Sequence, residues 1–164
     1  MKKLIGIILL TCLGYSVFAQ PTDSLQKMVS PDFGWTMMVP AAFKAVSDAE
    51  VKRINQKGKV AIEETIDQEI PLNTKAIFNY RKDFMHYMEA NYQPYDVKKD
   101  GAYLETNRAI YDVVYQTFER EMPDAKIDTA QEFETVNGLQ FSRFKVKIRL
   151  DAKFQIKMYM YNRL

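Results

Sequence analysis

The chain has 164 residues, with 23 lysines and arginines, 21 aspartates and glutamates, one histidine and one cysteine. This length suits one domain, and a composition that is 47% hydrophobic and 27% charged is that of a folded globular protein. These values exclude a fibrous or disordered chain, and a single cysteine excludes a disulfide-stabilised fold.

Residues 1–19 have the layout of a secretory signal peptide. Two lysines precede an apolar run over residues 4–13, and the small side chains before Gln20 predict cleavage between Ala19 and Gln20. The run is shorter than the ~20 residues that a membrane span requires. We therefore expect a periplasmic or secreted protein, with no transmembrane span in the mature chain.

Two alternatives for this segment are a buried N-terminal helix and a lipoprotein modified at Cys12. Thr11 does not suit the small residue that a lipid-attachment motif places before its cysteine. Cleavage would remove two lysines and Cys12, and it would leave equal numbers of basic and acidic residues. A balanced charge argues against nucleic-acid binding, and the loss of the cysteine excludes thiol catalysis and zinc–thiolate sites.

The rest of the chain predicts a linker over residues 20–32 and a single α+β domain over residues 33–164. The linker has two prolines, is mostly polar and shows no periodicity. We expect a mostly antiparallel sheet packed with one long helix and one or two short helices.

The first half of the domain predicts a strand over 35–39 and a helix over 48–57. Ser47 and Glu50 form a capping-box pattern at the start of this helix, and Gly58 suits its end. Ile62, Ile66 and Ile70 indicate a further helical piece, although three β-branched residues also suit a strand. Two antiparallel strands are predicted over residues 76–81 and 85–93.

The longest predicted helix covers residues 102–122 and is followed by Pro123. Its expected buried stripe consists of Tyr103, Asn107, Ile110, Val113, Val114, Thr117, Phe118 and Met122. Asn137-Gly138 then predicts a type I′ hairpin between strands 131–136 and 139–150. The apolar residues of the second strand change parity, which predicts a β-bulge near residues 142–143.

The register of the final hairpin follows from its hydrophobic pattern. A three-residue loop over 151–153 places every apolar residue on one face, whereas a two-residue loop mixes the faces. The predicted opposing pairs are Leu150–Phe154, Ile148–Ile156, Val146–Met158 and Phe144–Met160.

The opposite face of this hairpin is the candidate binding site. Its residues are Arg143, Lys145, Lys147, Arg149, Lys157 and Tyr159, with Tyr161 beside them. Lys147 opposite Lys157 is a like-charge pair, which is unfavourable unless it is solvated or neutralised. The face is either an anion-binding platform or a solvated surface compensated by the acidic stretch upstream, where an unbulged hairpin would set Glu132 opposite Arg143.

Other chemistry-bearing residues do not form a catalytic site in the sequence. His86 is the only imidazole and is interpreted as a structural residue on a strand face with Met88 and Ala90. Glu63 and Glu64 are adjacent and do not face each other, so they are expected to be solvated. We expect no catalytic residue, metal site or cofactor.

Aromatic residues are 13% of the chain and gather in its first half. The set consists of Phe33, Trp35, Phe78, Tyr80, Phe84, Tyr87, Tyr92, Tyr95 and Tyr103. They would either line a ligand cavity or form core and cross-strand contacts.

The order of these elements, with the segment from Trp35 through Val39-Pro40 to Phe43 near the front, resembles PsbP-like bacterial envelope proteins. The resemblance covers residues 33–164 and implies an α/β/α sandwich, also seen in the Mog-type Ran-binding protein. Characterised members bind or assemble other proteins and share no catalytic constellation. The family usually continues to another strand and a C-terminal helix, so this chain is either a minimal domain lacking that helix or a truncated product. The polar alternation at 145–149 also departs from a fully covered sheet and favours an open, one-sided one.

We therefore expect an exported, non-catalytic binding or scaffold protein whose partner is an envelope protein or an anionic surface component. The alternative is a soluble carrier of a small apolar or aromatic ligand, and an enzyme ranks below both.

Overall fold

The computed structural model of the chain describes residues 24–71 and 73–164. The predicted signal peptide and its cleavage site at Ala19 and Gln20 therefore lie outside the described residues. The chain divides into two compact units, one ending at Ala42 and the other covering Phe43–Leu164. The second unit begins later than residue 33, where the sequence placed the start of the domain.

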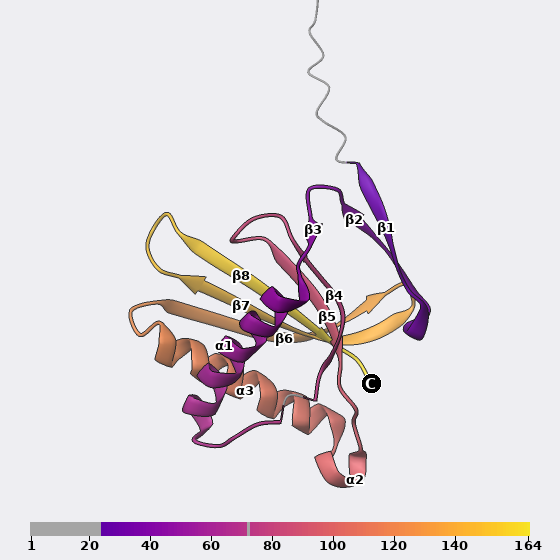
Figure 1. Cartoon of the computed structure of the whole chain (residues 1–164). Coiled ribbons are helices and arrows are strands. Elements are labelled where there is room, and N and C mark those ends of the chain that lie inside the picture. The colour runs from indigo at the N-terminus through magenta and orange to yellow at the C-terminus, as the bar shows by residue number, and fades with distance from the viewer. Residues whose placement is uncertain (1–23, 72) are drawn as a thin grey trace, which may run out of the picture. The chain divides into compact units, whose positions relative to one another are not determined.

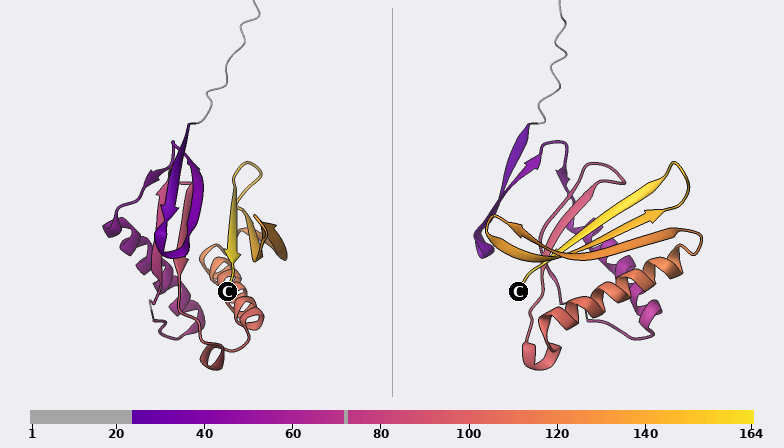
Figure 2. Two further views of the ribbon diagram at one scale, coloured as in Figure 1. Left: turned by 90° about the vertical axis from the view of Figure 1, so that its right-hand side faces the viewer. Right: turned by 180° about the vertical axis from the view of Figure 1, so that it is seen from behind.

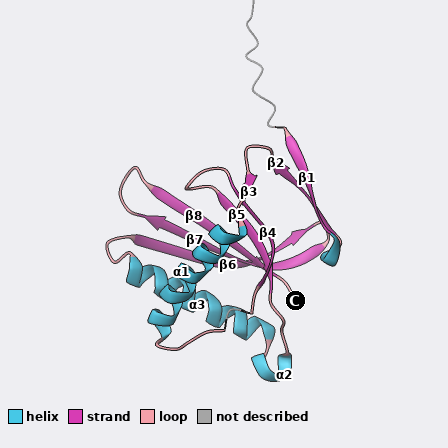
Figure 3. Ribbon diagram, in the orientation of Figure 1, coloured by secondary structure: helices cyan, strands magenta, loops and turns pink. Residues whose placement is uncertain are grey.

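The mixture of helices and antiparallel strands confirms the predicted α+β class (Figures 1 and 3). Two helices of 19 residues are present where a single long helix was expected. The elements in chain order are β1 (Leu25–Ser30), η1 (Pro31–Phe33), β2 (Trp35–Pro40), β3 (Lys44–Ala45), α1 (Asp48–Ile66), β4 (Lys75–Arg81), β5 (Tyr87–Tyr92), α2 (Val97–Asp100), α3 (Tyr103–Glu121), β6 (Lys126–Val136), β7 (Leu139–Arg149) and β8 (Gln155–Asn162).

The first unit is an antiparallel hairpin of β1 and β2, in which Leu25 lies opposite Pro40 and Ser30 opposite Trp35. Gly34 follows η1 with a φ of 64°, a left-handed conformation that glycine adopts without strain. The expectation of an irregular linker is wrong for residues 25–30. Strand pairing uses backbone groups, so β1 forms without the apolar periodicity on which the sequence argument relied.

Helix α1 begins where the sequence predicts but ends later. The Ser47 Oγ accepts a hydrogen bond from the Glu50 N–H at 3.4 Å, while the Glu50 carboxylate contacts Arg81 at 2.7 Å rather than completing a capping box. The predicted end at Gly58 is wrong, because this glycine lies inside the helix. One glycine destabilises a helix by only about 1 kcal/mol, which the residues around it outweigh.

The true end of α1 lies at Ile66, so Ile62 and Ile66 belong to a helix and not to a strand. Asp67 follows with a φ of 53°. The Glu63 carboxylate accepts the N–H of Ile70 at 2.7 Å and also contacts Lys59, which ties the exit segment back to the last turn.

Strands β3, β4 and β5 form one antiparallel sheet in that order. The predicted pairing of residues 76–81 with 85–93 is confirmed, although β5 is shorter than expected and Arg81 lies opposite Tyr87. The Asp83 carboxylate orders the connection by accepting the N–H groups of Met85 and His86, both at 2.9 Å. His86 lies just before β5 and not within the predicted strand face.

Helix α3 matches the predicted helix within one residue at each end. Its most buried residues are Asn107 and Tyr111, with exposed fractions of 4% and 2%. Ile110, expected in the buried stripe, is 43% exposed. The sheet-facing side of α3 therefore passes through Tyr111 instead, followed by Val114, Phe118 and Met122.

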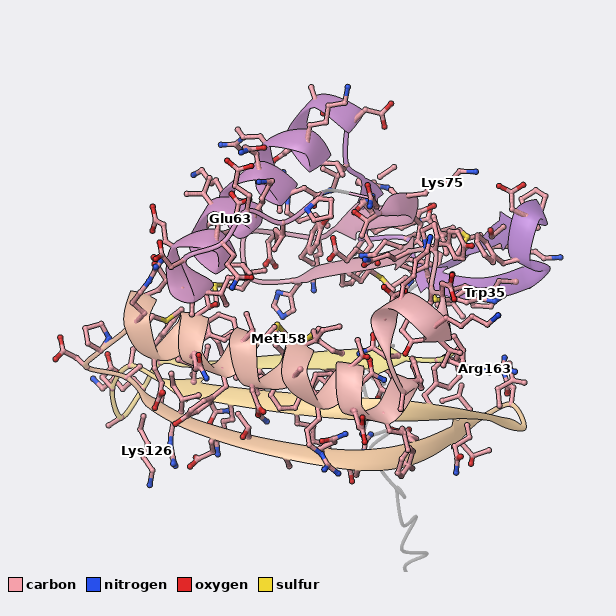
Figure 4. All side chains as sticks on the ribbon, turned by 90° about the horizontal axis from the view of Figure 1, so that it is seen from below. Trp35, Glu63, Lys75, Lys126, Met158 and Arg163 are labelled. Carbon is pink, nitrogen blue, oxygen red and sulfur yellow. The ribbon has the colours of Figure 1, made fainter. Side chains whose placement is uncertain are left out.

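Strands β6, β7 and β8 form the second sheet of this unit, and α3 lies along one of its faces (Figures 2 and 4). The two-residue turn at Asn137 and Gly138 is present, with φ values of 51° and 80°. The three-residue loop before β8 is also confirmed, since Ile148 lies opposite Ile156 and Phe144 opposite Met160. The Asp151 carboxylate accepts the N–H groups of Lys153 and Phe154 at 2.6 and 2.8 Å, which holds this loop closed.

The predicted bulge near Ser142 is absent, because the β6–β7 register runs without a shift from Lys126–Arg149 to Val136–Leu139. The strand instead buries Ser142 at 3% exposure, and the Tyr111 hydroxyl lies 3.0 Å from its Oγ. Phe141 consequently lies on the polar face, with its ring edge-on to that of Tyr161.

The core of the second unit lies between α3 and this sheet. Its buried residues are Tyr111, Phe144, Val146 and Ile148, and the Tyr111 ring stacks on Phe144 with centroids 4.4 Å apart. Ile156, Met158 and Met160 of β8 pack against the same cluster while half-buried. Figure 4 shows Met158 on the α3 side and Lys126 on the opposite side.

Candidate functional site

The face of the β6–β8 sheet opposite α3 carries all six predicted binding residues. Arg143, Lys145, Lys147 and Arg149 come from β7, and the register sets Lys157 opposite Lys147 and Tyr159 opposite Lys145. The placement of Lys157 and Tyr159 beside the β7 cations is the predicted one, because the β7–β8 hairpin has the predicted register. We call this surface the charged face; the binding role of its residues remains a prediction.

Strand β6 supplies three carboxylates to this face. The Glu132 carboxylate accepts hydrogen bonds from Arg143 Nε and Nη2 at 3.0 and 2.6 Å, and Lys145 contacts the same oxygen. Glu134 contacts Arg143, and Asp128 accepts from Arg149 Nη2 at 2.6 Å. The expectation that an unbulged hairpin sets Glu132 opposite Arg143 is confirmed.

These contacts change the acid–base properties of the pair that they join. Lys145 and Arg143 hold the pKa of Glu132 below its ordinary value. The hydrogen bond to Tyr161, together with Glu132 and Glu134, raises the pKa of Arg143. Both shifts favour the charged forms, so the β6 side of the charged face is an ion-pair network.

The β8 side of the charged face has a different balance. Lys147 lies opposite Asp128 on β6, but the Asp128 carboxylate binds Arg149, and within residues 24–71 and 73–164 neither Lys147 nor Lys157 has an ion-pair partner. The Nε of Arg149 is buried and has no hydrogen-bond partner among the same residues. The six basic side chains of the face outnumber its three carboxylates, and three of the six have no ion-pair partner among the described residues: Lys126 on β6, Lys147 on β7 and Lys157 on β8. The six are Lys126, Arg143, Lys145, Lys147, Arg149 and Lys157.

Two tyrosines on β8 extend this face. The Tyr159 side chain is 51% exposed. The Tyr161 hydroxyl accepts from Arg143 at 3.3 Å and donates to Glu134 at 3.2 Å, and Arg143 lies 5.8 Å from the Tyr161 ring centroid. Tyr159 is thus the open aromatic surface beside Lys157, whereas Tyr161 positions Arg143.

Lys126 belongs to the charged face and was missed in the sequence. The predicted strand began at Gln131, whereas β6 begins at Lys126, directly opposite Arg149. The sequence could have predicted it. If Val136 lies opposite Leu139 at the Asn137-Gly138 turn, counting back one residue at a time along each strand places Lys126 opposite Arg149.

The other sequence candidates occupy separate places. His86 is exposed in the β4–β5 connection, with its Nδ1 2.8 Å from the Asp83 carboxylate, and this hydrogen bond lowers the pKa of Asp83. Glu63 and Glu64 have separate partners, as expected for residues that do not face each other: Glu63 contacts Lys59 and Ile70, and Glu64 contacts Arg120 at 2.8 Å. The prediction that both are solvated is wrong for Glu63, whose side chain is partly buried because these contacts hold it against the end of α1. No group of three metal-ligating side chains occurs in the described part of the chain.

The aromatic residues of the first half do not gather around one cavity. Phe33 and Trp35 contact each other in the first unit, Phe78 and Tyr80 in β4, and Tyr95 meets Tyr103 edge-on at the start of α3. Phe84 is 92% exposed. Two surface hollows of about 420 and 370 Å³ lie elsewhere, the larger beside Tyr115, Met122 and Ile127 and the smaller beside Gln56, Val60 and Glu121. Both are lined partly by charged side chains, which are Glu119 and Lys126 at the larger hollow and Lys57, Glu64 and Glu121 at the smaller.

Comparisons of the chain with protein-family models, curated proteins and solved structures find no match. Among the described residues, no helix combines the length and apolar character needed to cross a membrane.

Proposed function

We propose that this protein is an exported, non-catalytic binding or scaffold protein of the cell envelope, and that its charged face contacts an acidic partner protein there. The single observation that carries the proposal is the Lys147–Lys157 pair. Two like charges directly opposite each other destabilise a sheet, and among the described residues neither lysine has an ion-pair partner, because Asp128, which lies opposite Lys147, binds Arg149. A partner carboxylate would convert this unfavourable contact into an ion pair.

The contrast with the β6 side supports this reading. Arg143, Lys145 and Arg149 each contact a carboxylate of β6, so these three cations are neutralised within the face, whereas Lys147 and Lys157 are not. Tyr159 adds an exposed aromatic side chain next to the unmatched lysines, and tyrosine is enriched at protein interfaces.

The exported and non-catalytic parts of the proposal rest on the sequence. Lys2, Lys3, the apolar run over 4–13 and the small residue at Ala19 support export. The likeness to PsbP-like proteins supports a role in binding or assembling other proteins. The contacts of His86 with Asp83 and of Glu64 with Arg120 also favour local structural roles for those residues.

Site-specific cross-linking in cells tests the proposal. A photo-reactive residue at position 157 should capture a discrete set of envelope proteins, and Lys147→Glu with Lys157→Glu should abolish that capture when the cross-linker is moved to position 159. The matched control is Lys52→Glu with Lys57→Glu, the same charge change on exposed residues of α1. Identical capture by both double variants would refute the proposed site, and an unprocessed N-terminus in the purified protein would refute export.

The carrier alternative would be favoured by a retained small-molecule mass. Native mass spectrometry of the purified protein separates the two functions, because a scaffold that binds through the charged face gives the protein mass alone.

A further inference from the structure

The outer edge of β8 has no strand beside it among the described residues. The sheet order is β6-β7-β8, so β8 pairs on one side only. The Leu150 N–H donates to the Phe154 carbonyl at 3.2 Å, which identifies Leu150–Phe154 as a hydrogen-bonded pair of the ladder. Because such pairs alternate, the backbone groups of Gln155, Lys157, Tyr159 and Tyr161 point away from β7.

This edge is long enough to accept another strand. β8 has eight residues, which span about 27 Å at ~3.4 Å per residue. Its four outward residues offer up to four N–H and four C=O groups for pairing. Natural proteins usually shorten, cover or charge such an edge, and β8 has one charged residue, Lys157, near its start.

The two faces of β8 define what an added strand must carry. On the α3 side, Ile156, Met158 and Met160 pack against the core but remain half-buried, so an apolar neighbour would complete their burial. On the charged face, Lys157 and Lys147 lack a carboxylate. A strand beside β8 therefore fits best when acidic side chains alternate with apolar ones.

The other edge of the same sheet has the acidic half of this pattern. β6 sets Asp128, Glu132 and Glu134 on the charged face, while its other side carries Ile127, which packs against the core, and Phe133 with polar residues between them. The carboxylates of β6 thus lie beside β7, and among the described residues β8 has no equivalent acidic neighbour.

We propose that β8 binds an extended segment of a partner protein as a fourth strand, with acidic residues facing Lys157 and Lys147 and apolar residues facing α3. This inference rests on the proposed function and specifies its partner: an acidic–apolar alternating segment recognised by strand addition. Main-chain hydrogen bonds would provide affinity, and the lysines would select acidic segments.

The test uses a synthetic peptide with the sequence of residues 126–136 in which valine replaces Thr129, Gln131 and Thr135, so that apolar residues alternate with the three acidic ones. On binding to the purified protein, amide hydrogen exchange should slow at Lys157, Tyr159 and Tyr161. The amides of Ile156, Met158 and Met160 should change little, because they already pair with β7. A peptide with lysine at the three acidic positions should not produce this period-two protection.

Two variants of one residue separate backbone pairing from side-chain contact. Tyr159→Pro removes an outward N–H without removing a β7 hydrogen bond, and should weaken peptide binding by about tenfold or more. Tyr159→Val also removes the aromatic ring but keeps the N–H, so it should bind the peptide at least about tenfold more tightly than Tyr159→Pro does. Because Tyr159→Pro could perturb the fold, a peptide N-methylated at alternate residues provides the same test on the unaltered protein, and it should fail to bind.

The outcomes are distinct. If Lys157→Glu abolishes binding but Tyr159→Pro and N-methylation do not, strand addition is wrong and an anion-binding charged face remains. If none of these changes matters, both proposals fail. New protection on β7 rather than β8 would mean exchange with β6 and would overturn the inference, as would concentration-dependent self-association through β8, which would identify a second copy as the occupant.

Discussion

The two faces of strand β7 differ in exposure and in charge, although their residues alternate along one backbone. Its α3-facing residues are at most 5% exposed, whereas the residues between them are only half-buried and are all charged over 143–149. The first set consists of Ser142, Phe144, Val146 and Ile148, and the second of Arg143, Lys145, Lys147 and Arg149. Core residues and residues of the charged face are therefore immediate neighbours along the same strand.

This separation makes register the most consequential property of the second unit. A slip of one residue would exchange the two sets, placing four cations against α3. The Asn137-Gly138 turn at one end of β7 and the Asp151 loop at the other fix the strand pairing. The Tyr111 hydroxyl also contacts the Ser142 hydroxyl, and this contact forms only in the observed register. Substitutions at neighbouring positions of β7 should therefore have very different effects on stability.

The largest expected effect is on the buried face. Ile148→Ala should destabilise the protein by about 2–5 kcal/mol, because Ile148 is 1% exposed and its truncation leaves a cavity beside Tyr111 and Phe144. Lys147→Ala, one residue away, should change the free energy of unfolding by no more than about 0.5 kcal/mol. Urea denaturation measures both, and comparable losses would mean that the two faces are not energetically distinct.

The next effect concerns the hydrogen bonds of the Tyr111 hydroxyl in the core. Tyr111→Phe removes the hydroxyl that lies 3.0 Å from Ser142 Oγ and accepts from Asn162 Nδ2 at 2.9 Å. The buried Ser142 hydroxyl would lose its partner, with a cost of about 1–3 kcal/mol. Tyr159→Phe makes the same change on the charged face and should cost less than about 0.5 kcal/mol. A thermal or urea titration in which Tyr111→Phe matches the unaltered protein would show that this contact does not hold the register.

A somewhat smaller effect is expected at the turn that sets the register. Gly138→Ala should destabilise by about 1–2 kcal/mol, because a φ of 80° is strained for any residue with a Cβ. Gly58→Ala should have the opposite sign and stabilise α1 by about 0.5–1 kcal/mol. No atom lies within 4 Å of either added Cβ, so backbone conformation alone decides both signs. Equal shifts in the unfolding midpoint would contradict this account.

The sequence predicts the C-terminal sheet better than the rest of the fold, for a physical reason. Hairpins are local, and Asn-Gly at 137–138 together with the apolar alternation from Phe144 to Met160 determines both pairings. β1 was missed because its pairing with β2 needs no apolar pattern, and the end of α1 was placed too early because Gly58 was given more weight than the residues after it.

The same local reasoning predicted the residues of the charged face, but it did not predict which of its cations form ion pairs with carboxylates. The parity change between Phe141 and Phe144 suggested a bulge, because without one Phe141 lies on the polar face. The unbulged strand instead buries Ser142, whose hydroxyl then needs a partner. That partner is Tyr111 on α3, and a contact between residues so distant in sequence leaves no local signal. The unbulged register then determines which carboxylates reach Arg143 and which lysines remain unmatched.

A smaller effect on stability is expected from changing the Lys147–Lys157 pair of the charged face. Lys157→Glu should stabilise the protein by about 0.2–1 kcal/mol, because it replaces a like-charge pair with an opposite-charge pair across β7 and β8, whereas Lys147→Glu would set a like charge opposite Asp128. The gain should shrink in high salt, which screens exposed charges. Lys52→Glu on α1 provides the same change of net charge, and an equal gain there would mean that net charge rather than the Lys147–Lys157 contact is responsible.

The smallest effect is the contribution of Glu132 to the acid limb of stability. Lys145 and Arg143 lower the pKa of this carboxyl from its ordinary value of 4.5, so the folded protein binds fewer protons than the unfolded chain at mildly acidic pH. Its contribution is fully present above pH 4.5 and is lost as the pH falls through the lowered folded value. Glu132→Gln should therefore have a flatter loss of stability on acidification, measured as the urea midpoint at successive pH values. Because the carboxylate is exposed, the difference between the two curves should diminish with added salt. Two parallel curves would show that the β6 carboxylates do not neutralise the charged face, and that the distinction between its β6 and β8 sides does not hold.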